Sequence, residues 1–152
     1  MKLNPYWVVG FVDGEGTFYV GINHQDSMTV GYQVLPEFRV VQHKRDIKLL
    51  YSLKEFFGCG VVRVNHDERY ELRVRDIKHL KDIIIPFFQK YELNTQKKFD
   101  FYKFQKIIGL MAEGRHLKET GVLEIIKIAE QMNRKEKISV IGIKEEILSR
   151  PN

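Results

Sequence analysis

The stretch Trp7–Gly16, with the sequence WVVGFVDGEG, constrains the fold of this chain most. It is too short to cross a membrane, which takes about 20 apolar residues, yet as a helix it is apolar on every side and must be buried all round. Gly10 and Gly14 lie four residues apart on one face, where a neighbouring backbone can approach closely. Asp13 and Glu15 follow at the carboxyl end, which already carries partial negative charge in any helix. We therefore expect a positive group at this end, and a metal ion is the first candidate.

Composition sets the broad class of the protein. A length of 152 residues suits one ordinary domain, here taken as residues 1–152. The net charge of +5 suggests an anionic partner, although basicity alone does not choose among nucleic acid, a membrane surface and an acidic protein. Cys59 is the single cysteine, which excludes an internal disulfide framework and fits a reducing compartment. No signal peptide and no stretch long enough for a transmembrane helix is visible, so no membrane partner is expected.

The hydrophobic periodicity predicts an α+β fold. Apolar residues alternate with a period of two in four segments and recur at helical spacing between them. Pro36 inside the second strand predicts an edge position or a bulge. We expect one four-stranded antiparallel sheet with helices on its apolar face. The predicted elements are a helix from Pro5 to about Asp13 ended by Gly14 and Gly16, strands 17–23 and 31–42, a helix 46–57, strands 61–65 and 69–74, a helix 76–85 interrupted by Pro86, and helices 95–109, 119–132 and 139–148, with a polar segment 133–137 before the last.

The polar faces of these strands carry hydrogen-bonding side chains suited to DNA bases. Arg pairs with guanine edges, Asn or Gln with adenine, and Glu accepts from cytosine, and a two-stranded ribbon fits the major groove. The alternative, an ordinary solvated face of an antiparallel sheet, is favoured by the pattern alone. The candidate base-contact residues are Tyr19, Asn23, Gln33, Glu37, Arg39, Arg63, Asn65, Glu71 and Arg73.

Lysines spread along the chain are candidates for phosphate contacts. Lys97 and Lys98 are distinct, because cations at a helix start oppose the helix dipole and so indicate a functional or ion-pair role. The five histidines and Cys59 show no metal-ligand spacing, and no phosphate-binding loop is present. The candidate phosphate contacts are Lys44, Lys48, Lys97, Lys98, Lys103, Lys106 and Lys118.

Four segments carry a family resemblance. Val8–Gly16 resembles the nine-residue motif of the LAGLIDADG homing endonucleases, with the glycines and both acids at matching positions. Phe38–Lys44 resembles the strand end F-x-V-x-Q-K of that family, Phe57–Val62 its G-x-G segment, and Lys97–Phe101 its helix start K-K-x-D-F. The similarity covers about residues 5–130.

The resemblance implies a particular fold and assembly. The family has a saddle-shaped core of helix-strand-strand-helix-strand-strand-helix, whose concave sheet enters the major groove of DNA. A chain with one motif is expected to form a homodimer, with Trp7, Gly10, Phe11 and Gly14 at the interface. Two Glu15 carboxylates then meet at the dimer axis and bind Mg²⁺ with help from the Gly14 carbonyl.

The resemblance also implies the reaction and its residues. The expected activity is metal-dependent hydrolysis of both strands of a long pseudo-palindromic target, across the minor groove, leaving 3′ overhangs. Glu15 is the metal-binding acid, Gln42 positions solvent, and Lys97 or Lys98 matches the lysine near the scissile phosphate. Arg45 is the choice for the helping basic residue, although strict register places Asp46 at that position. Asp13 is expected to be structural.

Two other functions stay open at this point. A group I intron RNA maturase, with intron RNA as its partner, uses the same fold in some relatives, and degenerate members become DNA-binding modules without catalysis. Intact Glu15, Gln42 and the lysine pair argue against the second of these. The resemblance to intron-encoded proteins implies an organelle, with the chloroplast preferred to the mitochondrion.

Overall fold

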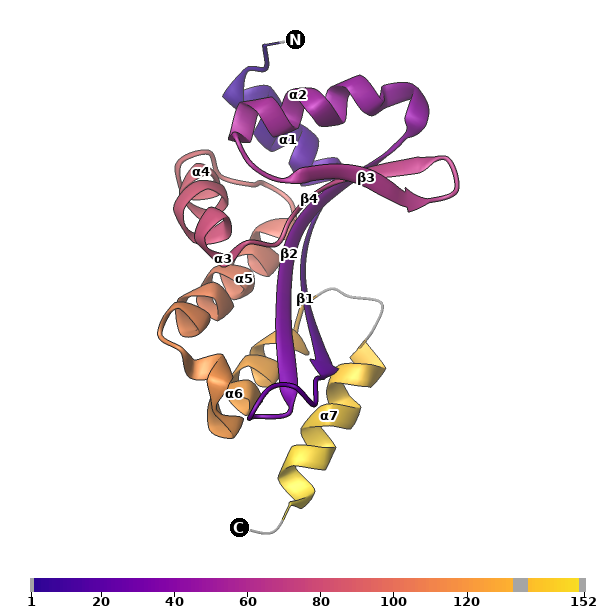
Figure 1. Ribbon diagram of the computed structural model, residues 1–152. Coiled ribbons are helices and arrows are strands. Elements are labelled where there is room, and N and C mark those ends of the chain that lie inside the picture. The colour runs from indigo at the N-terminus through magenta and orange to yellow at the C-terminus, as the bar shows by residue number, and fades with distance from the viewer. Residues whose placement is uncertain (1, 133–136, 151–152) are drawn as a thin grey trace. The chain divides into compact units, whose positions relative to one another are not determined.

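A four-stranded sheet with the strand order β1-β2-β4-β3 runs through the chain and confirms the expected α+β architecture. The computed structural model describes residues 2–132 and 137–150 (Figure 1). Short 3₁₀ helices occupy Lys44–Asp46 and Arg115–Leu117, and a π-helix occupies Leu80–Ile84. The strands and α-helices are α1 (Pro5–Glu15), β1 (Gly16–His24), β2 (Tyr32–His43), α2 (Ile47–Phe57), β3 (Val61–His66), β4 (Arg69–Val74), α3 (Ile77–His79), α4 (Ile85–Lys90), α5 (Lys97–Ala112), α6 (Glu119–Ala129) and α7 (Lys137–Ser149).

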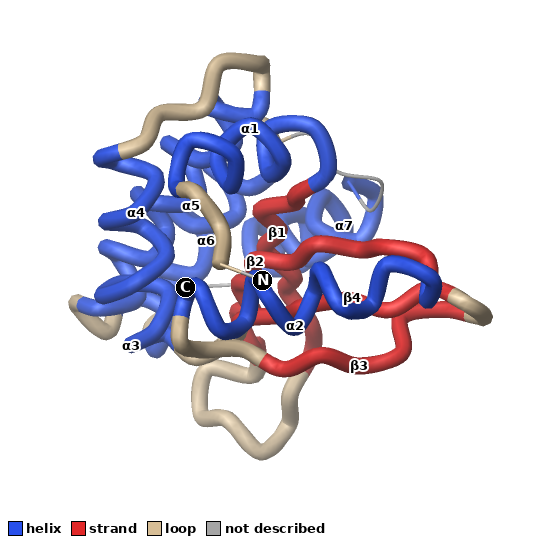
Figure 2. The backbone as a smooth tube through the Cα atoms, turned by 90° about the horizontal axis from the view of Figure 1, so that it is seen from above, coloured by secondary structure: helices blue, strands red, loops and turns tan. Residues whose placement is uncertain are grey.

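The chain divides into two compact units, and both long strands contribute to each of them. The first unit consists of residues 1–18 and 37–98, and the second of residues 19–36 and 99–152. In the first unit β2 pairs antiparallel with β4 from Phe38↔Val74 to His43↔Arg69, and β3 pairs antiparallel with β4. Helix α2 lies along β3 and β4 (Figure 2).

The apolar face of the first unit's sheet is closed by a cluster of aromatic rings. Phe38 is completely buried, and its ring centroid lies 5.4 Å from that of Phe18 and 5.6 Å from that of Phe88. Leu72 and Val74 on β4 are buried on this same side, as the alternation predicted. The opposite side of these strands is therefore free to carry polar side chains.

Helix α1 begins where predicted and ends two residues later than predicted. The Asn4 side chain accepts a hydrogen bond of 2.8 Å from the backbone N–H of Tyr6, which makes Asn4 the N-cap. The helix continues through Gly14 to Glu15, and Gly16 is extended with φ −87°. A Cβ on Gly16 would lie 2.6 Å from Cγ1 of Val12, so this position needs glycine for close approach. Gly14 thus lies inside the helix, which carries Glu15 on its last turn.

Pro36 and Pro86 both mark a change in the local hydrogen bonding. The expected edge position of Pro36 is wrong, because β2 is an inner strand, but Pro36 lies beyond the pairing of β2 with β4, which stops at Phe38. Pro86 occupies the first turn of α4, directly after the π-helix. The predicted interruption at Pro86 is confirmed, because the wider π turn ends one helical segment and a second begins.

In the second unit, helices α5, α6 and α7 supply most of the apolar core. Phe104, Ile125 and Ile126 are fully buried. The predicted polar segment over 133–137 lies almost wholly outside the described residues. Within the described part of the chain, no helix combines the length and the apolar character that a membrane span needs.

Candidate active site

The end of α1 and the end of β2 bring two predicted catalytic residues together. Glu15 is the last residue of α1 and is exposed. Gln42 is the second-last residue of β2, and its Nε2 donates to Oε2 of Glu15 over 3.4 Å. These side chains are 27 positions apart in sequence, so only the packing of α1 beside the sheet joins them. The pair presents a carboxylate and an amide at one exposed point.

Lys97 supplies the positive group that the acidic end of α1 required. Its Nζ donates to the backbone carbonyls of Val12 and Asp13, each over 3.0 Å. Carbonyls in the last turn of a helix have no N–H partner within the helix, and cations are favoured beside them. The structure therefore places an ammonium, from a residue more than 80 positions away, one turn from Glu15.

Asp13 connects the end of α1 to the residues just before α5, which fits the structural role expected of it. Its carboxylate accepts from the backbone N–H of Asn94 at 2.8 Å and of Thr95 at 3.2 Å, and from the hydroxyl of Thr95. Partial burial on its own would raise the pKa of Asp13, but the bonds from Thr95 and Asn94 outweigh it, and with Lys97 they lower the pKa. Asp13 thus remains ionised and holds the start of α5 against the end of α1.

The remaining two catalytic candidates, Lys98 and Arg45, lie in different surroundings. Lys98 follows Lys97 in the first turn of α5 and is half-buried. Arg45 lies exposed in the 3₁₀ helix Lys44–Asp46, where its backbone N–H donates to Nδ1 of His43 over 3.1 Å. Within the described part of the chain, the Arg45 side chain makes no hydrogen bond to Glu15 or Gln42.

The donor set at Glu15 fits a magnesium ion that is shared with other ligands. Among the described residues, no group of three His, Cys, Asp or Glu side chains is arranged to hold a metal. Glu15 offers one exposed carboxylate, and the carbonyl of Gly14 is among the last four of α1, which no N–H of the helix can reach. Mg²⁺ keeps several waters and is commonly held by one or two carboxylates together with substrate phosphate. Glu15 and the Gly14 carbonyl could therefore supply part of such a site.

Helix α1 is not buried all round within this chain. Val8, Val9 and Val12 face the core, whereas Trp7 is 45% exposed and Gly10 and Gly14 are exposed. The rings of Trp7 and Phe11 stack with centroids 4.9 Å apart. A Cβ placed on Gly10 or Gly14 would meet no atom within 4 Å. The expectation of complete burial is wrong for the single chain, because one apolar, small-residue face is left uncovered.

On the polar face of the first unit's strands, the glutamates are buried and the arginines that contact them are more exposed. Glu37 is only 2% exposed and Glu71 only 5%. Oε1 of Glu37 accepts from Nε of Arg75 at 2.9 Å, and Oε2 accepts from Nη1 of Arg39 at 3.0 Å. Both carboxylate oxygens of Glu37 thus accept hydrogen bonds from arginines below the surface, and the expected contact of Glu37 with DNA stays a prediction.

Glu71 shows a similar arrangement. Its Oε1 accepts from Nδ2 of Asn65 at 2.7 Å, and its Oε2 lies 3.9 Å from Nε of Arg73. Burial, together with Arg75 and Arg63, lowers the pKa of Arg73, and Nε of Arg73 is buried without a hydrogen-bond partner among the described residues. Glu71 therefore lies behind the polar groups that face outward instead of among them.

The structure also places the other base-contact candidates. Arg63 is exposed on β3, and its Nε donates to the carbonyl of Val64 over 3.4 Å. In the second unit, Tyr19 and Gln33 are half-buried and Asn23 is exposed. Arg75 was missed by the sequence reasoning, because the alternation was followed only to Val74. Phe38 pairs with Val74, so the next position along places Arg75 opposite Glu37, and extending the register by one residue finds it.

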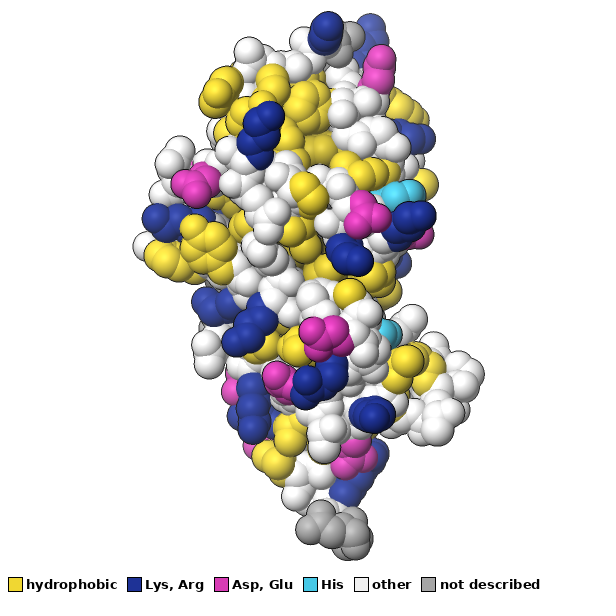
Figure 3. Space-filling model, turned by 90° about the vertical axis from the view of Figure 1, so that its left-hand side faces the viewer, with side chains coloured by type: hydrophobic (Ala, Val, Ile, Leu, Met, Phe, Trp, Pro, Cys, Tyr) yellow, Lys and Arg dark blue, Asp and Glu magenta, His cyan; other side chains and the backbone are white. Residues whose placement is uncertain are grey.

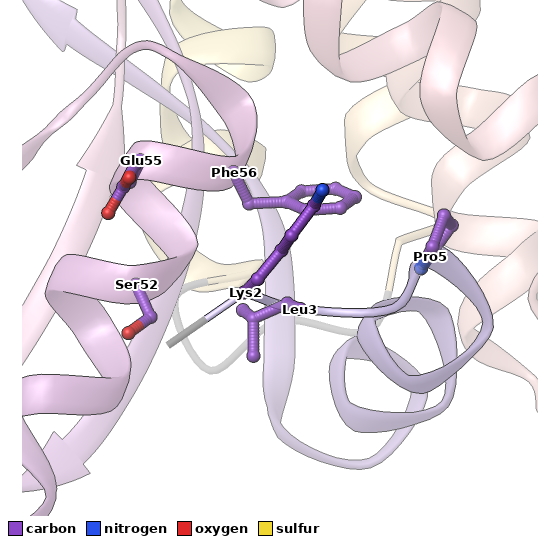
Figure 4. A pocket seen from close by; sticks show the side chains of 6 residues that line it. All are labelled: Lys2, Leu3, Pro5, Ser52, Glu55 and Phe56. Atoms are coloured by element: carbon purple, nitrogen blue, oxygen red, sulfur yellow. The ribbon is translucent and has the colours of Figure 1, made fainter.

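A pocket of about 620 Å³ lies at the opposite end of α1 from Glu15. Figure 4 shows the side chains that line it, which come from α2 on one side and from the chain start and the first turn of α1 on the other: Ser52, Glu55, Phe56, Lys2, Leu3 and Pro5. An 11-residue helix is about 16 Å long. The pocket is thus remote from the Glu15–Gln42 pair and plays no part in the site described above.

Most lysines are ordinary surface residues. On the face shown in Figure 3, Lys and Arg side chains are dispersed among hydrophobic and acidic ones and do not form one patch. Lys44 pairs with Glu68, its Nζ lying 2.9 Å from Oε1. Lys97 differs from these by its contacts with the end of α1, and the phosphate contacts expected of the other lysines stay a prediction.

Comparison with known proteins shows which proteins this chain is similar to. The sequence profile of the family described as "LAGLIDADG endonuclease" matches residues 8–108. A relative from Neurospora crassa, described as "Probable intron-encoded endonuclease 2", is 35% identical over 133 residues, which are 86% of this chain and 29% of the relative. The chain spans about a quarter of the length of two further relatives, 26% and 23%.

Two solved structures match the fold closely. The crystal structure of the homing endonuclease I-TnaI is 54% identical, with a TM-score of 0.93, over 97% of this chain and 99% of that one. The meganuclease I-SmaMI bound to uncleaveable DNA is 33% identical, with a TM-score of 0.91, over 100% of this chain and 51% of that one. The matched structures thus include one of the same extent as this chain and one about twice as long.

Proposed function

The chain belongs to the LAGLIDADG endonuclease family, and from this premise we propose that it cuts both strands of a specific DNA site by metal-dependent hydrolysis. One observation supports the proposal above all: Glu15 ends a helix with an uncovered glycine face, and Gln42 lies within hydrogen-bond distance of it. The helix supplies an assembly surface and an acid from a single segment. A DNA-binding protein without catalysis would need neither the acid nor the amide.

The chain's own residues divide the chemistry among them. Glu15, with the Gly14 carbonyl, would hold Mg²⁺, which when bound activates a water and stabilises the leaving 3′ oxygen. Gln42 can orient a water beside Glu15, because an amide both donates and accepts. Lys97 holds the last turn of α1 by its two carbonyl contacts, and so fixes where Glu15 points. Lys98 is the candidate for contact with the scissile phosphate.

The uncovered face of α1 supports a two-motif site. We propose that a second motif helix packs on Trp7, Gly10, Phe11 and Gly14 and brings a second acid beside Glu15. In a homodimer this partner is another copy of the chain, as the I-TnaI match of equal extent supports. In a longer protein it would be a second domain, as the I-SmaMI match to half of that chain suggests.

Recognition of DNA follows from the same symmetry. The polar strand faces supply arginines and amides that suit base edges in the major groove. Two such faces related by a two-fold axis would read a long pseudo-palindromic site, since the symmetry of a target mirrors that of its protein. Cuts across the minor groove would then leave 3′ overhangs, as the resemblance to the family implies.

A cleavage assay tests the proposal directly. The protein is incubated with a library of duplex sites and Mg²⁺, and the products are sequenced. We expect specific double-strand cuts by the wild-type chain. Glu15→Gln should lower the cleavage rate by at least a thousandfold while leaving binding measurable in Ca²⁺, because the amide keeps the shape and loses the charge that holds the metal (roughly 4 kcal/mol of barrier corresponds to that factor). Cutting by Glu15→Gln at the wild-type rate would show that Glu15 does not carry the reaction.

A second function, splicing assistance to a group I intron RNA, is tested with the same protein. A transcript of an intron takes the place of the duplex library, and faster splicing would favour the maturase. Intron-encoded relatives also support an organelle as the location. The preference for the chloroplast over the mitochondrion stays a prediction from the sequence.

A further inference from the structure

The two carboxylates on the polar strand face are placed as supports for arginines. Glu37 is the clearest case, because it is 98% buried and accepts from two different guanidinium groups at 2.9 and 3.0 Å. Arg39 lies two residues after Glu37 on the same face of β2, and Arg75 follows the end of β4. One carboxylate therefore joins the arginines of two neighbouring strands.

The strand register explains why a carboxylate is needed here. Arg39 pairs directly with Arg73 across β2 and β4, and like charges directly opposite each other are destabilising. Four arginines, at positions 39, 63, 73 and 75, share this face with two glutamates, at positions 37 and 71. The surplus of positive charge leaves the face attractive to an anion even after both carboxylates are paired.

The side chains of both arginines stay partly exposed while they contact Glu37. Arg75 uses Nε for Glu37, so its two η nitrogens, which lie at the far end of the guanidinium group, are not consumed by this bond. The Arg75 side chain is 41% exposed and the Arg39 side chain 33%, whereas the carboxylate between them is 3% exposed. A guanidinium group held by a buried acid loses less rotational freedom when it binds a base. The entropy cost of the contact is then lower, which favours the matching base over the others.

We propose that Glu37 is a positioning residue for DNA recognition, which aims Arg39 and Arg75 at two guanines of the target and touches no base itself. The inference rests on the proposed function and names two residues that would contact bases. One of them, Arg75, is not among the base-contact residues expected from the sequence. Glu71 holds Asn65 in a similar way.

Base preference, measured on a pool of randomised duplexes in Ca²⁺, tests the proposal. Arg39→Ala and Arg75→Ala should each erase a guanine preference at one position of the selected site. Glu37→Gln should weaken the preference at both of these positions by about fivefold or more, the lower limit of what one bidentate arginine contributes. The same variant should bind unselected DNA as tightly as the wild type or more tightly, since it loses a negative charge.

A loss of base preference together with undiminished binding to unselected DNA indicates a positioning role for Glu37. If Glu37 were only structural, Glu37→Gln would weaken binding to all sequences alike. Glu124→Gln is the matched control, because it breaks another Arg–Glu pair, with Arg115 on the second unit, and should change no base preference. Where Glu37→Gln fails to fold, as judged by circular dichroism, Glu37→Asp keeps the charge, withdraws the carboxylate by one methylene, and should weaken the same two positions.

Three results would overturn the inference. A loss of preference at one position that neither arginine variant affects would mean that Glu37 reads a base itself. Unchanged preferences in Glu37→Gln would mean that the arginines need no support, and a change confined to only one arginine's position would remove the double role. If the wild-type chain selects no sequence at all, the proposed function fails, which is a different result from any of these.

Discussion

At the scale of single residues, two unfavourable placements compensate each other. Asp13 adds negative charge at the end of α1, and Lys97 adds positive charge at the start of α5, so each opposes the dipole of its own helix. In the structure, Asp13 accepts from the backbone N–H groups of Asn94 and Thr95, just before α5, and Lys97 donates to the last turn of α1. The sequence showed each anomaly, but not that the two anomalies meet.

This junction predicts different effects for the two lysines. Lys97→Met should lower the free energy of unfolding by roughly 1–3 kcal/mol. In the wild type the Lys97 ammonium donates to two partly buried backbone carbonyls, and in the variant these carbonyls lose that charged donor. Lys98→Met should lose less stability and should slow cleavage at least tenfold if Lys98 meets the scissile phosphate. Urea unfolding and single-turnover cleavage of the selected site measure the two effects. Equal stability of the two variants would contradict the structural role of Lys97.

The Asp13 junction also predicts a pH dependence. The folded chain lowers the pKa of Asp13 below its ordinary value of 3.8. The stability that Asp13 contributes is therefore present above pH 3.8 and is lost as the pH falls below 3.8 and through the lowered pKa of the folded chain. The urea midpoint of the wild-type chain should drop as the pH falls below 3.8, and Asp13→Asn should flatten this part of the profile. A variant whose profile follows that of the wild type would show that the Asp13 carboxylate is not the titrating group.

At the scale of elements, alternation and helical spacing predicted what exists but not how deep each side chain lies. The strands, their faces and the interruption at Pro86 follow from local patterns in the sequence. The burial of Glu37 does not, because an alternating pattern says which face a residue occupies and not whether arginines of a neighbouring strand cover it. The contact of Gln42 with Glu15 depends likewise on tertiary packing, and only the family resemblance pointed to it.

The start of α6 offers an element-scale prediction. A Cβ added to Gly121 would lie only 1.7 Å from the backbone carbonyl oxygen of Arg115, so the 3₁₀ helix Arg115–Leu117 and α6 must separate to admit it. Gly121→Ala should therefore destabilise the chain by about 1–3 kcal/mol, the usual cost of overpacking. Gly109→Ala is the control, because a Cβ there meets nothing within 4 Å and alanine is the better helix former. Thermal unfolding of both variants gives the comparison, and a stable Gly121→Ala would show that this approach is looser than described.

At the scale of the whole molecule, the motif in α1 gave the family from sequence alone, and the match over residues 8–108 confirms it. The assembly was inferred from the same residues and stays a prediction, because nothing in one chain displays its partner. What the structure adds is a physical reason to expect one. The face of α1 formed by Trp7, Gly10, Phe11 and Gly14 is apolar or small and remains uncovered in the single chain.

A side chain placed on that face should separate assembly from folding. A Cβ added at Gly10 meets no atom within 4 Å in its own chain, so Gly10→Leu should keep the stability of the folded chain or raise it by up to about 1 kcal/mol through better helix propensity. The close approach of a second α1 would be blocked, and self-association should weaken at least tenfold, with cleavage falling in parallel. Gly109→Leu makes the same change on α5, again with open space around the Cβ, and should associate as the wild type does. Sedimentation equilibrium over a range of concentrations distinguishes the variants. A Gly10→Leu chain that still dimerises would move the interface away from α1, and Glu15 of one chain would then have no second acid to meet.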